Sequence, residues 1–198
     1  MSEARVTLDR RRAVAAILAD RGDAIAVSSL GNPTYDLAAA GDTPLNFYLW
    51  GAMGGALMVA LGLALAQPSR RVLAFLGDGE MMMGLGALAS VAVAAPKNLT
   101  AVVIDNERYA ETGSQLAHSG RGVDIVAIAR AAGFADVRAA QSEAQLLSTV
   151  AWAYASDGPL LLGVKVSSEP AKPVLPPRDG PYLRSRLREA LLGPIAHA

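Results

Sequence analysis

The fold of this chain is decided by one stretch, Val72-Leu73-Ala74-Phe75-Leu76-Gly77-Asp78-Gly79-Glu80. Its first five residues form an apolar run that stops at a Gly-Asp-Gly turn. A second apolar run at 101–104 stops in the same way at Asp105-Asn106, with 25 residues between Gly79 and Asp105. Short apolar runs bounded by turn residues are typical of strands buried on both faces of a parallel sheet. We therefore expect both polar tips to lie at one edge of such a sheet.

Helical and strand patterns alternate along the rest of the chain, which favours an α/β fold: a doubly wound parallel sheet with helices on both faces. In such sheets ligands bind beyond the carboxyl ends of the strands. Further strands are predicted at 24–29 and 160–166, and helices at 10–21, 52–65, 83–93, 124–132 and 143–155.

The two tips carry groups suited to an anion held through a metal ion. Asp78 offers a carboxylate and Asn106 an amide oxygen, and oxygen atoms are the ligands that Mg²⁺ prefers. Gly77 and Gly79 leave room for the backbone to approach an anion, which amides at the start of a following helix can face. By itself a Gly-Asp-Gly motif is weak, because an ordinary strand-to-turn junction explains it equally well.

The flanking motifs make the pattern specific. FYLWGAMG stands at 47–54, MMGLG at 82–86 and YAETGSQ at 109–115. Together with the two tips, this set resembles thiamine diphosphate enzymes over about residues 14–166. The similarity is strongest to the diphosphate-binding chains of the sulfopyruvate and phosphonopyruvate decarboxylase family. Asp105 departs from the family pattern, in which many members have a first Asn, whereas Asn106 keeps the residue that binds the metal.

The resemblance implies the fold of a diphosphate-binding domain and a role for each matched residue. Mg²⁺ would be bound by Asp78, Asn106 and the backbone carbonyl of Arg108. Met53 would hold the cofactor in its bent shape, and the carbonyl of Gly51 would receive the 4′-amino group of the aminopyrimidine. The cofactor-binding set is then Gly31, Asn32, Gly51, Met53, Gly77, Asp78, Gly79, Glu80, Asn106, Arg108 and Tyr109.

Several of these residues have a plainer reading. A methionine is often a gap-filler in a core, but the position of Met53 in Gly-Ala-Met-Gly, 25 residues before Asp78, favours the cofactor role. His118 is either a catalytic proton carrier or a solvated loop histidine. Arg108 or Arg121 either binds a substrate anion or is surface charge. For Glu111 no partner is evident, so we expect a structural or solvent-facing side chain.

Length sets the main limit on function. A chain of 198 residues makes about one domain, whereas these enzymes need a second domain that binds the pyrimidine and supplies a glutamate. The resemblance therefore implies a beta-type subunit of a 2-oxo acid decarboxylase, inactive without a separately encoded pyrimidine-binding partner. An α2β2 assembly is expected. We predict a cofactor-binding domain over residues 1–167 and a Pro-rich extension over 168–198. The extension should run extended as far as a short helix at 182–192. It either follows the surface of this chain or straps the partner.

Composition excludes other classes of protein. The 18 basic and 18 acidic residues balance, so there is no electrostatic signature of nucleic-acid binding. The chain has no cysteine and its start, residues 1–5, shows no apolar signal core, so we expect a cytoplasmic location. The uncharged stretch 49–66 has the length of a membrane span, but its four glycines favour a helix buried against the sheet or a partner.

Two alternatives remain open. In the first alternative, the chain is the beta subunit of another split thiamine diphosphate enzyme, a carboligase or a 2-oxoacid oxidoreductase. In the oxidoreductases cysteines hold iron–sulfur clusters, which a partner would have to supply here. The non-enzyme alternative is a nucleotide-binding module, against which stands the sequence SSLGN at 28–32 in place of a Gly-x-Gly-x-x-Gly turn.

Overall fold

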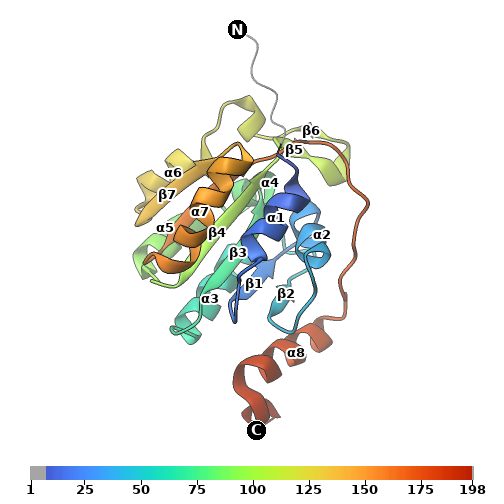
Figure 1. Cartoon of the computed structure of the whole chain (residues 1–198), viewed down its shortest axis with the longest axis vertical. Coiled ribbons are helices and arrows are strands. Elements are labelled where there is room, and N and C mark those ends of the chain that lie inside the picture. The colour runs from blue at the N-terminus through green and yellow to red at the C-terminus, as the bar shows by residue number, and fades with distance from the viewer. Residues whose placement is uncertain (1–7, 198) are drawn as a thin grey trace.

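A six-stranded sheet forms the middle layer of the computed structural model, which describes residues 8–197 (Figure 1). All neighbouring strands run parallel. Residues 1–5, for which the sequence predicts no signal core, lie outside the described residues. In spatial order the strands are β2 (Asn46–Tyr48), β1 (Ile25–Ser28), β3 (Val72–Gly77), β4 (Leu99–Asp105), β8 (Leu160–Lys165) and β7 (Asp136–Ala140).

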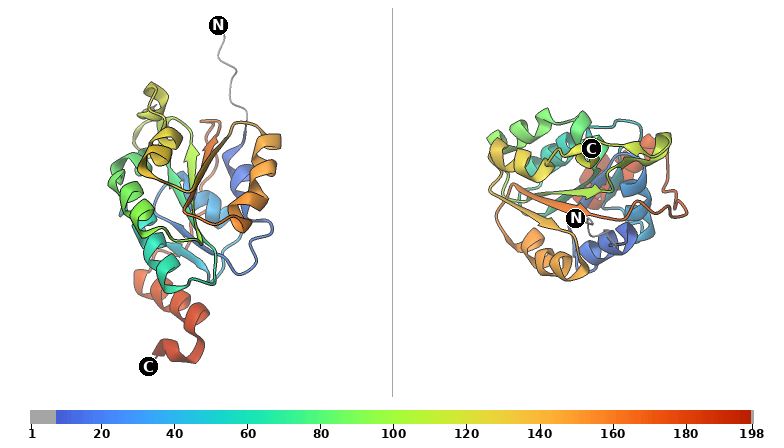
Figure 2. Two further views of the ribbon diagram at one scale, coloured as in Figure 1. Left: turned by 90° about the vertical axis from the view of Figure 1, so that its left-hand side faces the viewer. Right: turned by 90° about the horizontal axis from the view of Figure 1, so that it is seen from above.

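Helices cover both faces of the sheet, as Figure 2 shows. Successive side chains of a strand point to opposite faces, so Phe75 packs into one core cluster and its neighbours Ala74 and Leu76 into the other. The predicted fold class is confirmed. One face carries α1 (Arg10–Leu18), α2 (Asn32–Ala39) and α7 (Glu143–Ala155), and the other carries α3 (Ala56–Ala66), α5 (Gly86–Ala94) and α6 (Ile125–Ala132).

Several boundaries differ from the prediction. The helix expected at 52–65 begins only at Ala56, because Gly54 has a φ of +86°. The helix expected at 83–93 is broken at Gly84 and Leu85 into α4 (Asp78–Met83) and α5. The sequence reading missed α2, β2, β7 and the hairpin of β5 (Arg108–Tyr109) with β6 (Gln115–Leu116).

The register of β3 against β4 places the two polar tips side by side. Gly77 pairs with Ile104, so Asp78 and Asp105, the next residue of each strand path, emerge at the same level. Both tips therefore lie at the carboxyl edge of the sheet, as predicted.

The C-terminal segment runs from this edge down one side of the molecule to α8 (Gly180–Leu192) at the opposite end (Figure 1). Residues 168–179 form no helix or strand and follow an extended path (Figure 1). The helix starts at Gly180, two residues before the predicted start, because Pro181 sits in the first turn, where its missing N–H has no partner to lose. Asp179 caps it by accepting from the Tyr182 amide at 2.9 Å. The division at residue 167 stays a prediction.

The apolar stretch 49–66 forms a loop and the 11 residues of α3. Within residues 8–197, no helix has the length and apolar character needed to cross a membrane.

Candidate functional site

A cavity of about 160 Å³ opens at the carboxyl edge of the sheet. Of the residues predicted to bind cofactor or metal, or to act in catalysis, all except Gly51 and His118 line it. The lining members of that set are Gly31, Asn32, Met53, Gly77, Asp78, Gly79, Glu80, Asn106, Arg108 and Tyr109.

Two helices begin at this cavity. Gly31 is the N-cap of α2, and Asp78 is the first residue of α4, directly after β3. The first amides of a helix have no partner within the helix and carry partial positive charge, so helix starts bind anions. The cavity thus presents two sets of backbone donors to one region, an arrangement suited to a diphosphate.

Asp78 is buried beside the cavity and is held by a residue far away in the sequence. The Ser119 hydroxyl lies 2.7 Å from Oδ2 of Asp78 and 2.9 Å from Oδ1 of Asp105. Burial raises the pKa of Asp78 to about 6, and the nearby charge of Asp105 adds to the rise, whereas the Ser119 hydrogen bond opposes it. A cation bound here would favour the ionised carboxylate.

Asp105, which departs from the family pattern, has its charge balanced within the chain. Its Oδ2 lies 2.8 Å from Lys165 Nζ, and its Oδ1 accepts from the Glu107 amide at 3.1 Å. Lys165 is the residue of β8 that pairs with Asp105 in the sheet. Sequence reasoning missed Ser119 and Lys165, and the register of β4 against β8 is the signal that would have found Lys165.

Asn106 sits in a tight turn after β4. Its Oδ1 accepts from the Arg108 amide at 3.1 Å and, as an amide oxygen, keeps a second lone pair for a metal ion. The guanidinium of Arg108 donates to the Ser114 carbonyl at 3.1 Å. Arg108 lines the cavity and Arg121 does not, so of the two candidate anion-binding arginines only Arg108 is placed at the site.

Gly79 is required by a close approach. A Cβ built at Gly79 would lie 2.4 Å from the Tyr109 ring, so the ring lies directly against the start of α4. The Tyr109 hydroxyl is 3.0 Å from Nδ1 of His118. His118 is exposed and outside the cavity lining, and Tyr109 is its link to the site.

Glu80 lines the cavity, but its carboxyl group is buried. Burial raises its pKa to about 7, and the amides of Gly54 and Ala56 and the Ser29 hydroxyl lie close enough to oppose the rise. Among the described residues, neither carboxylate oxygen makes a hydrogen bond of normal geometry. Glu80 therefore lies beneath the loop that carries Met53.

That loop is fixed by a contact between two glycines. A Cβ at Gly84 would lie 2.2 Å from the Gly54 carbonyl oxygen, and a Cβ at Gly54 would lie 2.9 Å from the Gly84 amide. Met53, just before Gly54, is 41% exposed at the cavity wall, so it does not fill the core of this chain. Gly51 is exposed in the same loop.

The sequence reading missed part of the lining. Glu111, expected to be structural or solvent-facing, is exposed and has a partner that the sequence did not indicate: it accepts from the Tyr35 hydroxyl at 3.4 Å and packs against Gly31. Arg10 is buried in an ion pair with Asp36. The lining residues that were not predicted are Arg10, Leu30, Pro33, Met83, Ile104, Ala110, Glu111 and Thr112.

The donor set fits a diphosphate bound together with a hard divalent cation. Two helix starts supply amides, Asp78 and Asn106 supply oxygen ligands, and Gly77 and Gly79 place no side chain between backbone and anion. Within the described part of the chain, no group of three or more His, Cys, Asp or Glu residues is arranged to hold a metal ion. Mg²⁺ commonly needs only one or two protein groups when phosphates complete its shell.

Comparison with known proteins gives the same picture. Residues 31–164 match the family model described as thiamine pyrophosphate enzyme, C-terminal TPP binding domain. The chain is 38% identical to sulfopyruvate decarboxylase subunit beta of Methanothermobacter thermautotrophicus over 159 residues, which is 80% of this chain and 82% of that protein. It is 41% identical to phosphonopyruvate decarboxylase of Streptomyces viridochromogenes over 144 residues, which is 73% of this chain but only 36% of that protein.

Solved structures agree on the fold. The 4-hydroxybenzoylformate decarboxylase of Rhodococcus jostii RHA1, a thiamine diphosphate-dependent enzyme, superimposes with a TM-score of 0.69 at 23% identity, over 85% of this chain and 34% of that one. From the family match and the identity to the beta subunit, we conclude that this chain belongs to the thiamine pyrophosphate enzymes and contains their C-terminal TPP-binding domain.

Proposed function

We propose that this chain is the diphosphate-binding subunit of a thiamine diphosphate- and Mg²⁺-dependent decarboxylase of a small 2-oxo acid, of the sulfopyruvate or phosphonopyruvate type. The observation that carries the proposal is the cavity in which Asp78 and Asn106 lie together with the starts of α2 and α4. The enzyme would be cytoplasmic, which a cysteine-free chain permits.

The metal would be held by three oxygen atoms of this chain. Asp78 would give one carboxylate oxygen while the Ser119 hydroxyl holds the other. Asn106 would give its amide oxygen and Arg108 its backbone carbonyl. Phosphate oxygens and water would supply the other ligands, and the amides that begin α2 and α4 would neutralise the remaining phosphate charge.

When bound, thiamine diphosphate supplies a nucleophilic carbon and an electron sink for the loss of CO₂. The chain would bind and orient it: Met53 would support its bend from the cavity wall, and the carbonyl of Gly51 would accept from the pyrimidine amino group. Arg108, at the cavity, is the cation available to an anionic substrate. His118 would move a proton through its contact with the Tyr109 hydroxyl.

The site would be completed by a partner chain that binds the pyrimidine and supplies the catalytic glutamate. The name of the relative from Methanothermobacter thermautotrophicus, subunit beta, supports a separate partner. The helices α3 and α5 also support it, since neither contains a charged residue and they lie on the same face of the sheet. Exposed apolar patches of this kind mark interaction sites. The exposed apolar side chains of these helices include Met58, Leu65 and Val93.

The decisive experiment is to co-express this chain with a separately encoded pyrimidine-binding subunit and to assay CO₂ release. Sulfopyruvate, phosphonopyruvate and pyruvate would be supplied in turn with thiamine diphosphate and Mg²⁺. We expect release from one acid, only when both chains are present, and none with Asp78→Ala. Bound cofactor without CO₂ release from any acid would contradict decarboxylation and direct the work to carboligation or ferredoxin-linked oxidation.

A further inference from the structure

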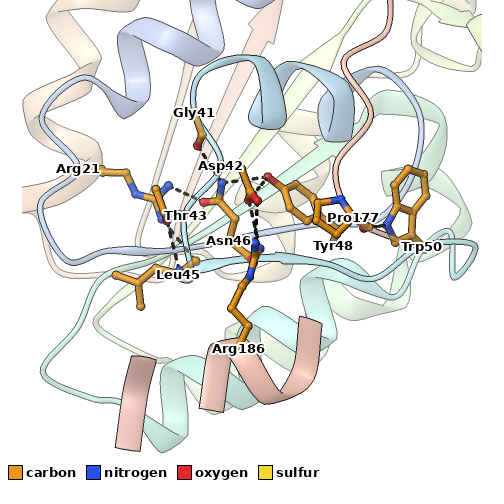
Figure 3. Close-up of polar contacts among 10 residues, drawn as sticks. All are labelled: Arg21, Gly41, Asp42, Thr43, Leu45, Asn46, Tyr48, Trp50, Pro177 and Arg186. Atoms are coloured by element: carbon orange, nitrogen blue, oxygen red, sulfur yellow. Dashed lines mark hydrogen bonds and ion pairs between the residues drawn. The ribbon is translucent and has the colours of Figure 1, made fainter. Parts of the chain in front are cut away.

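Trp50, the residue before Gly51, links the site to the C-terminal segment. Its indole N–H donates to the Pro177 carbonyl at 2.8 Å, and the Arg178 guanidinium lies over the indole, 5.0 Å from the ring centroid. The close-up shows Trp50 and Pro177 facing one another beside β2 (Figure 3). These contacts join positions more than 120 residues apart in the sequence. They hold Trp50, the residue at the start of the loop that carries Met53.

The backbone of Trp50 is strained and held from the other side. Its φ is +46°, in the left-handed region that a non-glycine residue seldom adopts. Its amide donates to the Ser29 carbonyl at 3.1 Å, and the Leu49 amide donates to Ser28 at 2.8 Å. Such a conformation persists only when its surroundings fix it. Here β1 fixes the main chain and the C-terminal segment fixes the side chain.

The C-terminal segment is itself anchored at both ends. Upstream, Arg11 donates to the Lys172 carbonyl at 2.7 Å. Downstream, Leu183 and Leu187 of α8 are buried, so the helix is docked rather than free.

The polar part of the α8 anchor is a network around Asp42. Arg186 donates to both carboxylate oxygens of Asp42, at 2.6 and 3.1 Å, and to the Asn46 carbonyl at 3.0 Å. Asp42 also accepts from the Tyr48 hydroxyl at 2.9 Å. Figure 3 shows Arg186 reaching from α8 to this group. The arginine is nearly buried, with its side chain 11% exposed, and a forked pair of this kind fixes geometry as well as charge. The C-terminal segment thus runs alongside β2. It contacts Trp50, just after the end of this strand, and Asn46, at its start.

We propose that residues 168–192 form a clasp that positions the Trp50–Met53 loop, with Trp50 as the positioning residue that the clasp holds. The inference rests on the proposed function, because it gives Gly51 and Met53 their roles toward the cofactor. The clasp lies outside residues 31–164, the part that matches the family model. Its predicted effect is on the orientation of the cofactor, because it holds Trp50 in the loop of Met53, whereas Asp78 and Asn106 stand at the ends of β3 and β4.

The test compares variants that open the clasp at its two ends. Trp50→Phe keeps an aromatic ring but removes the N–H donor, and Arg186→Gln breaks the fork on Asp42. Arg184→Gln, on an exposed position of α8, is the matched control. Amide hydrogen exchange of residues 49–54 is measured on the full chain, and turnover and thiamine diphosphate affinity are measured on the enzyme assembled with its partner.

We expect both variants to speed exchange of residues 49–54 by about fivefold, the effect of losing one hydrogen bond. They should lower kcat about tenfold while the Kd of thiamine diphosphate with Mg²⁺ changes less than threefold. Arg184→Gln should change none of these. Unchanged exchange at 49–54 in both variants, with faster exchange of α8 in Arg186→Gln, would overturn the clasp. If the wild-type chain binds no thiamine diphosphate, the proposed function fails, but the exchange result still decides whether the clasp holds the loop.

Discussion

The hydroxyl of Ser119 lies 2.7 Å from the buried carboxylate of Asp78, across 41 residues of sequence. The same hydroxyl lies 2.9 Å from Asp105. It has one proton, so it can donate fully to only one of the two carboxylates. In the proposed function, a metal ion on one oxygen of Asp78 would keep that carboxylate ionised, so that its other oxygen could accept from Ser119.

Ser119→Ala tests this arrangement. Groups that orient a metal ligand typically contribute 10–100-fold to metal affinity. We therefore expect the Mg²⁺-dependent affinity for thiamine diphosphate to fall by roughly 10-fold or more, measured by titration calorimetry. Ser148→Ala, at an exposed position of α7, is the control. Equal affinity in the two variants would mean that Ser119 does not support the metal ligand.

Glu80→Gln tests the buried carboxyl through the pH dependence of stability. Burial raises the pKa of Glu80 from 4.5 to about 7, so the neutral form is favoured in the folded chain. Its contribution to stability is full below pH 4.5 and is lost as the pH rises to about 7. Relative to wild type, the glutamine variant without cofactor should gain up to roughly 3 kcal/mol between pH 4.5 and 8, at about 1.4 kcal/mol per pKa unit.

Urea unfolding of wild type and Glu80→Gln at several pH values measures that difference. The titration of Asp78 is common to both proteins and cancels. Glu143→Gln, at an exposed position of α7, is the matched control. A constant difference between wild type and Glu80→Gln across this pH range would show that the carboxyl group titrates as it does in water.

Met53→Ala separates orientation of the cofactor from its binding. Because Met53 is 41% exposed at the cavity wall, its truncation should hardly affect folding. We expect kcat to fall by about tenfold or more while the Kd of thiamine diphosphate rises less than threefold. Leu147→Ala, at an exposed position of α7, should change neither kcat nor cofactor affinity. Equal losses in kcat and cofactor affinity would reduce Met53 to a packing residue.

Gly79→Ala should displace the Tyr109 ring, since the new Cβ would lie 2.4 Å from it. Thiamine diphosphate affinity should fall about tenfold or more by calorimetry, because the misplaced ring narrows the cavity. The double variant Gly79→Ala with Tyr109→Ala should bind no worse than Tyr109→Ala alone. Fully additive losses would place the fault in the backbone of α4 instead.

The central strands of this fold were predicted well from the sequence, because each apolar run ends at a clear turn signal. The run before Asp78 and the run before Asp105 end in polar turns, and the register of Gly77 with Ile104 then places both tips together. The missed elements are short or atypical. β2 has three residues, and α2 starts with Pro33 in its first turn, which reads as a helix breaker from sequence.

The site was predicted only as far as local motifs reach. Asp78, Asn106 and Tyr109 stand in motifs and line the cavity, whereas Ser119, Lys165 and Trp50 act through contacts made by distant segments. The distance in sequence between Trp50 and Pro177 shows why: strand order and the path of the C-terminal segment must be known before such a pair can be recognised. The role of His118, which reaches the site only through Tyr109, stays a prediction.

The central claim is that this chain binds the diphosphate of thiamine diphosphate through a metal ion on Asp78 and Asn106. Its most direct test is calorimetric titration of thiamine diphosphate, with and without Mg²⁺, into this chain assembled with a pyrimidine-binding partner. The account predicts binding with Mg²⁺ only, and its loss in Asp78→Ala and Asn106→Ala. Binding of equal affinity without Mg²⁺, or in either variant, would contradict it.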